Sequence, residues 1–256
     1  MLILLPPSER KATREGGRGR PARFDTLSFP ELEPTRSRLR EALAQVSAAP
    51  DAYARLGLSE GLVDQIEHNT RLDTAPALPA EELYTGVLYD ALGLPDMPGP
   101  ARRRARASIV VISALFGALR LRDRVPPYRL SAGNTVPGLP SLAKLWRPAL
   151  DTVLPAAAGR GVILDCRSGG YMAMWTPPKH MTERWVHVVV PGASHMAKHT
   201  RGEVARAICC SRAPAPRTTS ALFDLVLDEM GETHEVRTTP PTSATKPWTL
   251  SVRPRT

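Results

Sequence analysis

The segment LILLPPSERK, residues 2–11, sets the first element of the fold, because its apolar run ends abruptly at two prolines. A secretory signal would place positive charge first and then about 7–15 apolar residues, so this shorter run favours a buried strand. Similar short apolar runs recur at 108–112, 161–164 and 185–190. Continuous runs of this kind, bounded by turn residues, indicate strands that are buried on both faces.

Helical patterns lie between and after these runs. Five segments are expected to form helices: 35–46, 79–92, 139–154, 200–210 and 220–230. The alternation of strands and helices predicts an α/β fold. We expect a single α/β domain over residues 1–238. Residues 239–256 form a basic tail rich in proline, which is expected either to pack as an extended segment or to stay mobile.

The chain has more basic than acidic residues. Its 256 residues include 34 Lys and Arg, of which five are Lys, against 25 Asp and Glu, for a formal net charge of +9. The apolar fraction of 42% excludes a wholly disordered chain. No apolar run reaches the roughly 18 residues that a membrane-spanning helix needs. The surplus favours phosphate-rich partners, although a chain rich in Arg, Ala and Pro is also typical of a GC-rich genome.

The three cysteines are Cys166, Cys209 and Cys210. An odd count with one adjacent pair predicts neither a disulfide framework nor a zinc site. We therefore expect a cytoplasmic protein whose reduced thiols serve as small packing groups. A redox-sensing role for Cys166 is the alternative, because Arg167 follows it and a nearby cation lowers the pKa of a thiol.

Polar residues follow the first predicted strand directly. Ser8 offers a hydroxyl, Glu9 a carboxylate and Lys11 a cation, at the end of a strand where sites in α/β folds are usually built. This set could bind a phosphate, with Glu9 orienting Lys11. It could also serve nucleophilic chemistry if Lys11 were desolvated. The alternative is a polar strand-to-loop transition with a surface ion pair.

The segment 113–129 is the most informative for binding. It starts with Ser113 at the end of an apolar strand and then carries four guanidiniums, those of Arg120, Arg122, Arg124 and Arg129. Arginine binds phosphate through a bidentate fork, so this cluster predicts an anion site. Tyr128 follows two prolines and could stack on a base, while Asp123 could orient one arginine. The alternative is a solvated basic loop with Tyr128 packed on the core.

A glycine-containing turn, residues 165–171, follows the third predicted strand. Its two glycine amides could bind an anion, beside Arg167, Ser168 and Tyr171. Asp165 is a candidate general acid or base, or a partner for an arginine. The alternative is a purely structural turn with an ion pair between Asp165 and Arg167.

The segment after residues 185–190 carries further cations. A helix that begins near Thr200 would combine its free amides with Arg201 in another anion pocket, and Lys198 and Gly202 lie beside it. His195 and His199 are four residues apart, but no third ligand is evident in the sequence. We therefore expect no metal and no cofactor.

Five blocks of sequence occur in an order typical of one family. They are LLPPSERK (4–11), YTGVLYDAL (84–92), the segment 113–130, DCRSGGY (165–171) and KHTRG (198–202). Together they resemble the YaaA family of peroxide-stress-resistance proteins, in its actinobacterial-type branch, whose first block typically reads LPPSEGK. Arg10 stands where the family usually has glycine, which adds a positive charge beside Lys11.

The resemblance implies a compact YaaA-like domain with a mixed central sheet, flanking helices and a basic cleft. It also implies binding of double-stranded DNA and a helix-hairpin-helix-like element, for which residues 55–62 are the candidate. The alternative for these residues is a helix-turn-helix element that only packs against the core. A role in limiting intracellular iron and oxidative damage is implied as well.

We expect the polar segments to converge on one basic cleft. Its binding residues would be Lys11, Ser113, Arg120, Tyr128, Arg129, Arg167, Ser168, Tyr171, Lys198, Arg201 and Gly202. The first hypothesis is sequence-independent binding of double-stranded DNA. The second is an enzyme acting on a nucleotide-like or phosphorylated small molecule. In such an enzyme the catalytic residues would be Ser8, Glu9, Lys11, Asp123 and Asp165. A third hypothesis, an iron- or redox-handling protein, lacks a clustered ligand motif in the sequence. We expect a monomer with no membrane partner.

Overall fold

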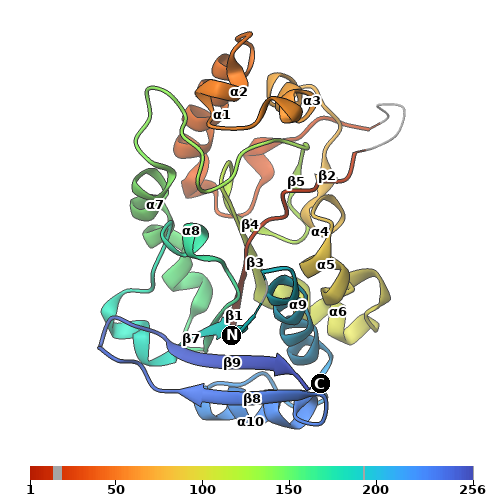
Figure 1. Cartoon of the computed structure of the whole chain (residues 1–256), viewed down its shortest axis with the longest axis vertical. Coiled ribbons are helices and arrows are strands. Elements are labelled where there is room, and N and C mark those ends of the chain that lie inside the picture. The colour runs from red at the N-terminus through yellow and green to blue at the C-terminus, as the bar shows by residue number, and fades with distance from the viewer. Residues whose placement is uncertain (14–18, 193, 256) are drawn as a thin grey trace.

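A seven-stranded mixed sheet forms the centre of the computed structural model, which describes residues 1–13, 19–192 and 194–255 (Figure 1). The strand order is β4-β3-β1-β6-β7-β9-β8. The five inner strands β3, β1, β6, β7 and β9 run parallel, and the edge strands β4 and β8 are antiparallel to their neighbours. The strands are β1 (Leu2–Leu5), β3 (Ile109–Ser113), β4 (Gly117–Arg120), β6 (Ile163–Asp165), β7 (Trp185–Val189), β8 (His234–Thr239) and β9 (Trp248–Pro254). A separate small ladder pairs β2 (Leu78–Pro79) with β5 (Arg124–Val125).

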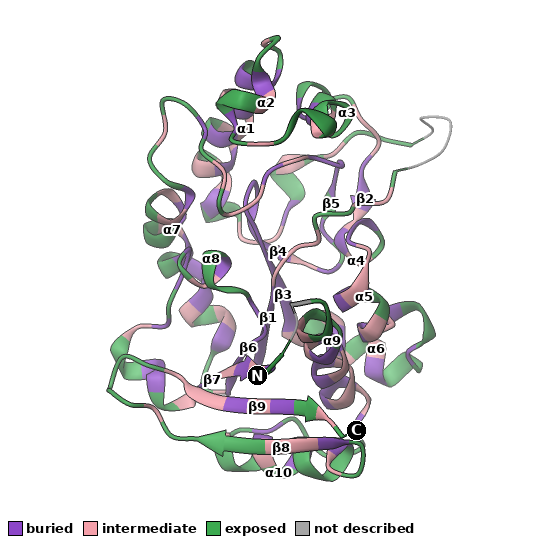
Figure 2. Ribbon diagram, viewed as in Figure 1, coloured by how far each residue is buried: buried purple, intermediate pink, exposed green. Residues whose placement is uncertain are grey.

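The core of the molecule lies along the central strands. Every residue of β1, β3 and β6 is buried, as continuous apolar runs require, and the strands expected from the four runs are confirmed. Figure 2 shows the burial concentrated there, while α2, α3 and β8 expose much of their surface. The α/β fold class with a mixed central sheet is therefore confirmed.

Helices flank this sheet on two sides. In Figure 1, α7 and α8 lie to the left of β1 and β3, whereas α5, α6 and α9 lie to their right. Helix α9 packs against α5, α6 and α10. The helices are α1 (Glu33–Ser47), α2 (Ala52–Arg55), α3 (Val63–Glu67), α4 (Ala80–Leu83), α5 (Val87–Leu92), α6 (Gly99–Ser108), α7 (Leu142–Ala158), α8 (Gly169–Met172), α9 (Ser194–Cys210) and α10 (Thr219–Met230).

Strand β1 lies at the point where the chain reverses its direction across the sheet. From β1 the chain leads to β3 on one side, and it later crosses to β6 on the other side of β1. In open sheets of parallel strands, ligands bind beyond the carboxyl ends of the strands at such a reversal. The topology therefore directs attention to the loop at residues 6–11, which follows β1.

The helix expected over residues 79–92 is broken into α4 and α5. Tyr84 is extended between them and forms a β-bridge with Lys11, and Gly86 has a φ of +98°. Glycine adopts such a backbone conformation without the steric cost that a Cβ would bring. The break therefore brings the chain before α5 against the loop after β1, which the helical periodicity of the segment did not predict.

The C-terminal segment supplies a strand of the sheet. Strand β8 crosses the expected boundary between residues 238 and 239, and β9 lies between β7 and β8. Leu250 and Val252 of β9 are fully buried at alternate positions, as a strand with one covered face requires. The sequence of residues 10–24 is rich in Arg and Gly, which predicts a flexible loop. Residues 14–18 of this segment lie outside the described residues. On either side of them, the amide of Ala12 donates to the backbone oxygen of Leu83, and Pro21 pairs with Pro76.

Candidate functional site

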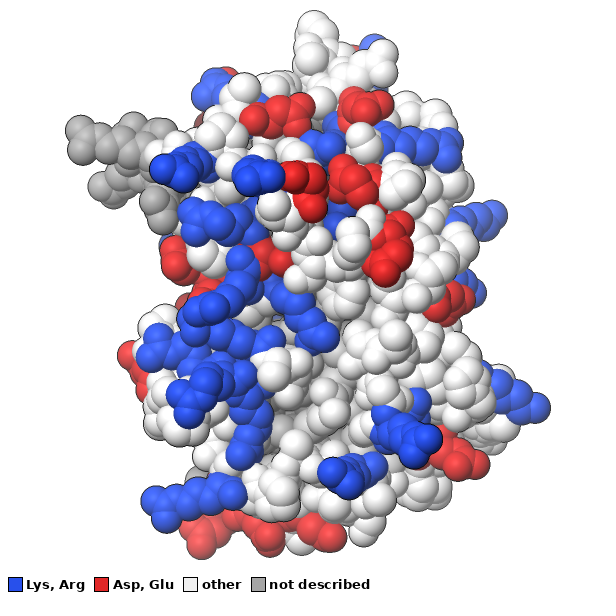
Figure 3. Space-filling view, turned by 180° about the vertical axis from the view of Figure 1, so that it is seen from behind, with Lys and Arg blue, Asp and Glu red and all other residues white. Residues whose placement is uncertain are grey.

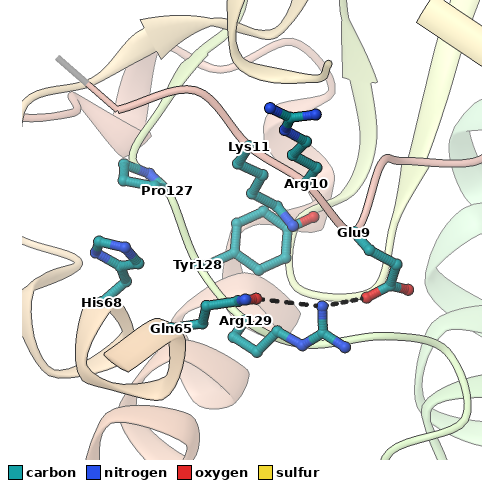
Figure 4. A pocket seen from close by; sticks show the side chains of 8 residues that line it. All are labelled: Glu9, Arg10, Lys11, Gln65, His68, Pro127, Tyr128 and Arg129. Atoms are coloured by element: carbon teal, nitrogen blue, oxygen red, sulfur yellow. Dashed lines mark hydrogen bonds and ion pairs between the residues drawn. The ribbon is translucent and has the colours of Figure 1, made fainter. Parts of the chain in front are cut away.

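Two adjacent pockets lie on either side of the loop that follows β1. The first, here called the Lys11 pocket, measures about 350 Å³ and is drawn in Figure 4. It is lined by Glu9, Arg10, Lys11, Gln65, His68, Pro127, Tyr128 and Arg129. The second, here called the Lys198 pocket, measures about 330 Å³. It is lined by Pro6, Pro7, Ser8, Glu9, Arg10, Thr85, Gly86, Val87, Leu88, Tyr89, Ser168, Tyr171, Lys198 and Arg201. Glu9 and Arg10 line both pockets, so the two pockets share a wall.

This site is strongly cationic. Of the described residues that line the two pockets, five are Lys or Arg and a single one, Glu9, is a carboxylate. The five cations are Arg10, Lys11, Arg129, Lys198 and Arg201. They come from three separate parts of the chain, which meet because β1 lies at the centre of the sheet. A concave surface with one sign of charge concentrates anions.

Lys11 is the most unusual cation of the site. Its Nζ donates a hydrogen bond to the backbone oxygen of Ser8 at 3.0 Å and lies 4.1 Å from the centre of the Tyr128 ring. Burial lowers the pKa of Lys11 from 10.5 to about 7, with Glu9 opposing and Arg129 assisting the shift. About half of the Lys11 amines are therefore neutral at pH 7, and a neutral amine is a nucleophile and a base.

Tyr128 forms the floor of the Lys11 pocket. Its hydroxyl bonds to Ser113 Oγ at 2.8 Å and to the Tyr84 hydroxyl at 3.0 Å, and Ser113 Oγ accepts the amides of Leu115 and Phe116. Burial raises the pKa of Tyr84 to about 12 and also raises that of Tyr128, so both phenols stay neutral at pH 7. Ser113 thus lies behind the pocket, where it fixes the Tyr128 ring.

Arg129 lies opposite Lys11 and pairs with Glu9. The distance from Arg129 Nη1 to Glu9 Oε2 is 2.7 Å, and Nη1 also donates to Gln65 Oε1 at 3.5 Å. The backbone of Arg129 is held at both its N–H and its C=O by the side chain of Asn69. The buried Nε of Arg129 finds no hydrogen-bond partner among the described residues. The guanidinium therefore keeps donor capacity for a ligand.

The wall formed by Gln65 and His68 was not predicted from the sequence. Gln65 belongs to α3, and His68 to a 3-10 turn (His68–Arg71) that follows it. This region continues the candidate hairpin element, in which α2 and α3 are joined through Gly57 with a φ of +64°. A glycine turn between two short helices was visible in the sequence, but its position beside Lys11 depends on tertiary packing.

The Lys198 pocket joins the β1 loop to α5, α9 and the loop after β6. The Ser8 hydroxyl donates to the backbone oxygen of Thr85, and the Tyr89 hydroxyl donates to that of Pro6 at 2.7 Å. Arg201 donates from Nε to the backbone oxygen of Val188 at 3.2 Å, whereas Lys198 is exposed. These bonds fix the walls of the pocket, and they leave the Lys198 amine in contact with solvent.

Asp165 and Arg167 form a buried ion pair instead of a pocket wall. Arg167 donates from Nε and Nη2 to the two carboxylate oxygens at 2.8 and 2.7 Å, and both side chains are fully buried. Arg167 also donates to the backbone oxygens of Tyr171 and Trp175, and Trp185 donates to Asp165. Arg167 strongly favours the charged carboxylate, and the pKa of Asp165 is lowered although burial alone would raise it.

Three other expected site residues lie away from the described pocket walls. The antiparallel hairpin β3–β4 returns Arg120 to the level of Val110, toward the other end of β3 from Ser113. Asp123 accepts bonds from Ser28 and from the Arg120 amide, so it stabilises a turn there. Gly202 lies where α9 crosses α5, and a Cβ would collide with the backbone of Leu88.

The described residues offer neither a metal site nor a reactive Cys166. In residues 1–13, 19–192 and 194–255, no group of three or more His, Cys, Asp or Glu side chains is placed to hold a metal ion. His199 instead contacts Glu203 at 3.2 Å. Burial raises the pKa of Cys166 to about 12 and outweighs the lowering by Arg201, so the thiol stays protonated at pH 7.

A second group of basic residues lies on the surface around α6. Figure 3 shows Lys and Arg gathered on the side that carries α6. Arg106 of α6 pairs with Glu81 through two bonds, at 2.9 and 2.6 Å, and Arg104 donates to the backbone of Ile208 and Ser211. These arginines thus hold α6 to its neighbours, whereas Arg103 is exposed.

None of the helices in the described part of the chain has the length and apolar character needed to cross a membrane.

The chain is similar in sequence to one family of known proteins over most of its length. A family described as "Peroxide stress protein YaaA" matches residues 1–224. A UPF0246 protein of Streptomyces coelicolor is 42% identical over 260 residues, which cover 98% of this chain and 98% of that protein. UPF0246 proteins of Corynebacterium efficiens and Corynebacterium glutamicum are 38% and 37% identical, over 92% and 84% of this chain and 95% and 87% of theirs. The family match includes every segment that lines the two pockets.

Proposed function

The chain belongs to the peroxide stress protein YaaA family, and from this premise we propose that it binds double-stranded DNA without sequence preference and so limits oxidative damage. It acts in this proposal as a monomer in the cytoplasm. One observation carries the proposal: five cations and one carboxylate line two adjacent pockets at the carboxyl end of the central strand. Such a site favours phosphate groups.

The size of the pockets defines how a duplex would contact them. Each measures roughly 330–350 Å³, which matches a small ligand and not a double helix. The duplex would therefore lie across the pocket mouths, with its phosphates bound by Arg10, Lys198 and Arg129. The hairpin element of α2 and α3 lies beside the Lys11 pocket, where its backbone amides can add phosphate contacts.

A salt titration tests this proposal. The dissociation constant of a fluorescein-labelled duplex of mixed sequence is measured by anisotropy between about 50 and 200 mM salt. Affinity should fall steeply as salt rises, and it should be equal for duplexes of different sequence. Each phosphate contact removed, as in Lys198→Gln or Arg10→Gln, should reduce the slope of log K against log salt by about 0.9.

Lys246→Gln is the matched control, because it removes one exposed cation from the connection between β8 and β9. It should leave affinity and slope almost unchanged. Absence of salt-dependent duplex binding contradicts the proposal. Equal losses in Lys198→Gln and Lys246→Gln contradict the assignment of the site.

A second candidate function is favoured by Lys11. An amine with a pKa near 7, beside a carboxylate in a pocket of about 350 Å³, is more than backbone binding needs. This feature supports an enzyme that acts on a nucleotide-like or phosphorylated small molecule. Nucleotides or sugar phosphates should then raise the melting temperature of the chain, and less so in Arg129→Gln. A panel of these compounds that leaves the melting temperature unchanged counts against the enzyme.

A further inference from the structure

The five lysines of the chain divide into two groups by their surroundings. Lys144, Lys179, Lys198 and Lys246 are exposed, whereas Lys11 is partly buried and its amine faces the Tyr128 ring at 4.1 Å. A solvated ammonium is protonated at pH 7 and lacks the lone pair that a nucleophile needs. The position of Lys11 removes much of that hydration, so the chain holds one lysine with a distinct chemistry.

The groups around Lys11 are suited to a ligand that carries negative charge. Figure 4 shows the Lys11 side chain extending toward the Tyr128 ring, with Arg129 and Glu9 along the same pocket. Arg10 lines the same pocket, and the buried Nε of Arg129 has no partner among the described residues. A phosphate bound by the Arg129 guanidinium would bring the rest of its molecule against the Lys11 amine.

We propose that Lys11 forms a Schiff base with an aldehyde or ketone that carries a phosphate group, which Arg129 binds. The inference rests on the anion binding proposed for this site and adds a covalent step to it. Amines of desolvated lysines react with carbonyl compounds in this way. Tyr128 stays neutral beside the amine, so it shields the lysine without offering it a counter-charge.

The step balances without a further reagent. The amine nitrogen attacks the carbonyl carbon with its lone pair, a C–N bond forms, and the π electrons move to the carbonyl oxygen. This oxygen takes up protons and leaves as water, while the nitrogen loses its own protons and a C=N bond forms. One amine and one carbonyl compound thus give one imine and one water molecule, with no oxidant or reductant. Protons exchange with solvent at the open mouth of the pocket.

The phosphate-bearing carbonyl has two possible sources. One is a free sugar phosphate. The other is an abasic nucleotide in DNA, whose ring-opened deoxyribose is an aldehyde between two phosphates. Both share the chemistry that the pocket fits, and the experiment distinguishes them by using one probe of each kind.

Reductive trapping of the full chain tests the inference. The chain is incubated at pH 7 with sodium cyanoborohydride and either glyceraldehyde 3-phosphate or a duplex with one abasic site, and adducts are mapped by peptide mass spectrometry. Lys11 should be labelled about tenfold faster than Lys144 or Lys246, because more of its amine is neutral at this pH. Glyceraldehyde without phosphate should label it more slowly. The probe that gives a Lys11 adduct shows which of the two phosphate-bearing carbonyl compounds the pocket accepts.

Two variants control this experiment. Lys11→Arg keeps the positive charge and should abolish the fast adduct, whereas Lys246→Arg, at an exposed lysine outside both pockets, should retain it. Mapping on the unmodified chain needs no variant, so the test survives if Lys11→Arg does not fold. Labelling of Lys11 no faster than that of Lys246 with both probes overturns the inference. Duplex binding and its salt dependence are then measured separately. If they are present, only the covalent step fails. If they are absent, the proposed function fails as well.

Discussion

Two carboxylate–arginine pairs lie near the carboxyl ends of adjacent strands, and they differ in what surrounds them. Asp165–Arg167 follows β6, and Glu9–Arg129 lies beyond β1. Both pairs have an N–O distance of 2.7 Å. The side chains of the first pair are 0% exposed, whereas those of Arg129 and Glu9 are 13% and 47% exposed.

The difference teaches which pair serves the fold and which can serve a ligand. The Asp165–Arg167 pair uses its remaining bonds on the backbone of Tyr171 and Trp175 and on Trp185. A buried pair of this kind stabilises only while both partners are present. Arg129 keeps an unpartnered Nε, and its backbone is anchored by Asn69. Its guanidinium pairs with the side chains of Glu9 and Gln65, so it can exchange these partners for a ligand without loosening the backbone of the fold.

The largest effect is expected on breaking the buried pair. Arg167→Gln leaves the Asp165 carboxylate buried without its counter-charge, so the free energy of unfolding should fall by about 3–5 kcal/mol. Denaturant titration followed by circular dichroism measures this loss. A loss below about 1 kcal/mol would mean that the buried pair stabilises the fold no more than the Glu9–Arg129 pair does, which contradicts the distinction drawn between them.

A smaller effect is expected from the titration of Lys11. Its pKa is lowered to about 7 in the folded chain, against a usual value of 10.5 when unfolded. Between pH 7 and pH 10.5 the unfolded chain binds more protons than the folded chain, so the contribution of Lys11 to stability rises with pH over this range. Below pH 7 Lys11 is charged in both the folded and the unfolded chain, so the folded chain keeps the full free-energy cost of burying that charge.

Lys11→Met removes this titration. From pH 7 to pH 10, the unfolding free energy of the natural chain should rise by about 1–3 kcal/mol relative to that of the variant. This is less than the full pKa shift would give, because Lys11 is only partly buried and solvent reduces the effect. Melting curves at several pH values measure it. A constant difference over this range would show that Lys11 is solvated and charged.

The smallest effect is expected from Glu9→Gln. Removing the one carboxylate among the described pocket residues should raise duplex affinity about two- to threefold through the local potential. Stability should change by less than about 0.5 kcal/mol, since Glu9 is half exposed. Anisotropy and thermal melting check the two values. A weaker affinity would mean that Glu9 itself contacts the ligand or orients its binding groups.

Much of the fold could be predicted from the sequence. The apolar runs that became β1, β3, β6 and β7 have a local signature, because strands buried on both faces need continuous apolar residues. Strand β9 has no such run: its buried Leu250 and Val252 alternate with polar residues after a proline-rich stretch. The break between α4 and α5 depends on the bridge from Lys11 to Tyr84, which is a tertiary contact.

The candidate site could be predicted only in part. The residues after β1 and near Lys198 line the pockets because parallel strands end at one edge. Arg120 is the last residue of β4, which runs back along β3, so the same reasoning placed Arg120 at the wrong end of β3. The sequence alone does not distinguish Asp165–Arg167 from Glu9–Arg129, since burial decides between them. Gln65 and His68 carry no motif, and only packing brings them to Lys11.

The substitution Arg129→Gln tests the central claim most directly, when duplex affinity and melting temperature are measured on the same preparation. The account predicts that affinity falls about tenfold with a salt slope reduced by about 0.9, while the melting temperature stays within a few degrees of that of the natural chain. Unchanged affinity with a melting temperature lowered as far as in Arg167→Gln would contradict it. Arg129 would then serve the fold, as Arg167 does.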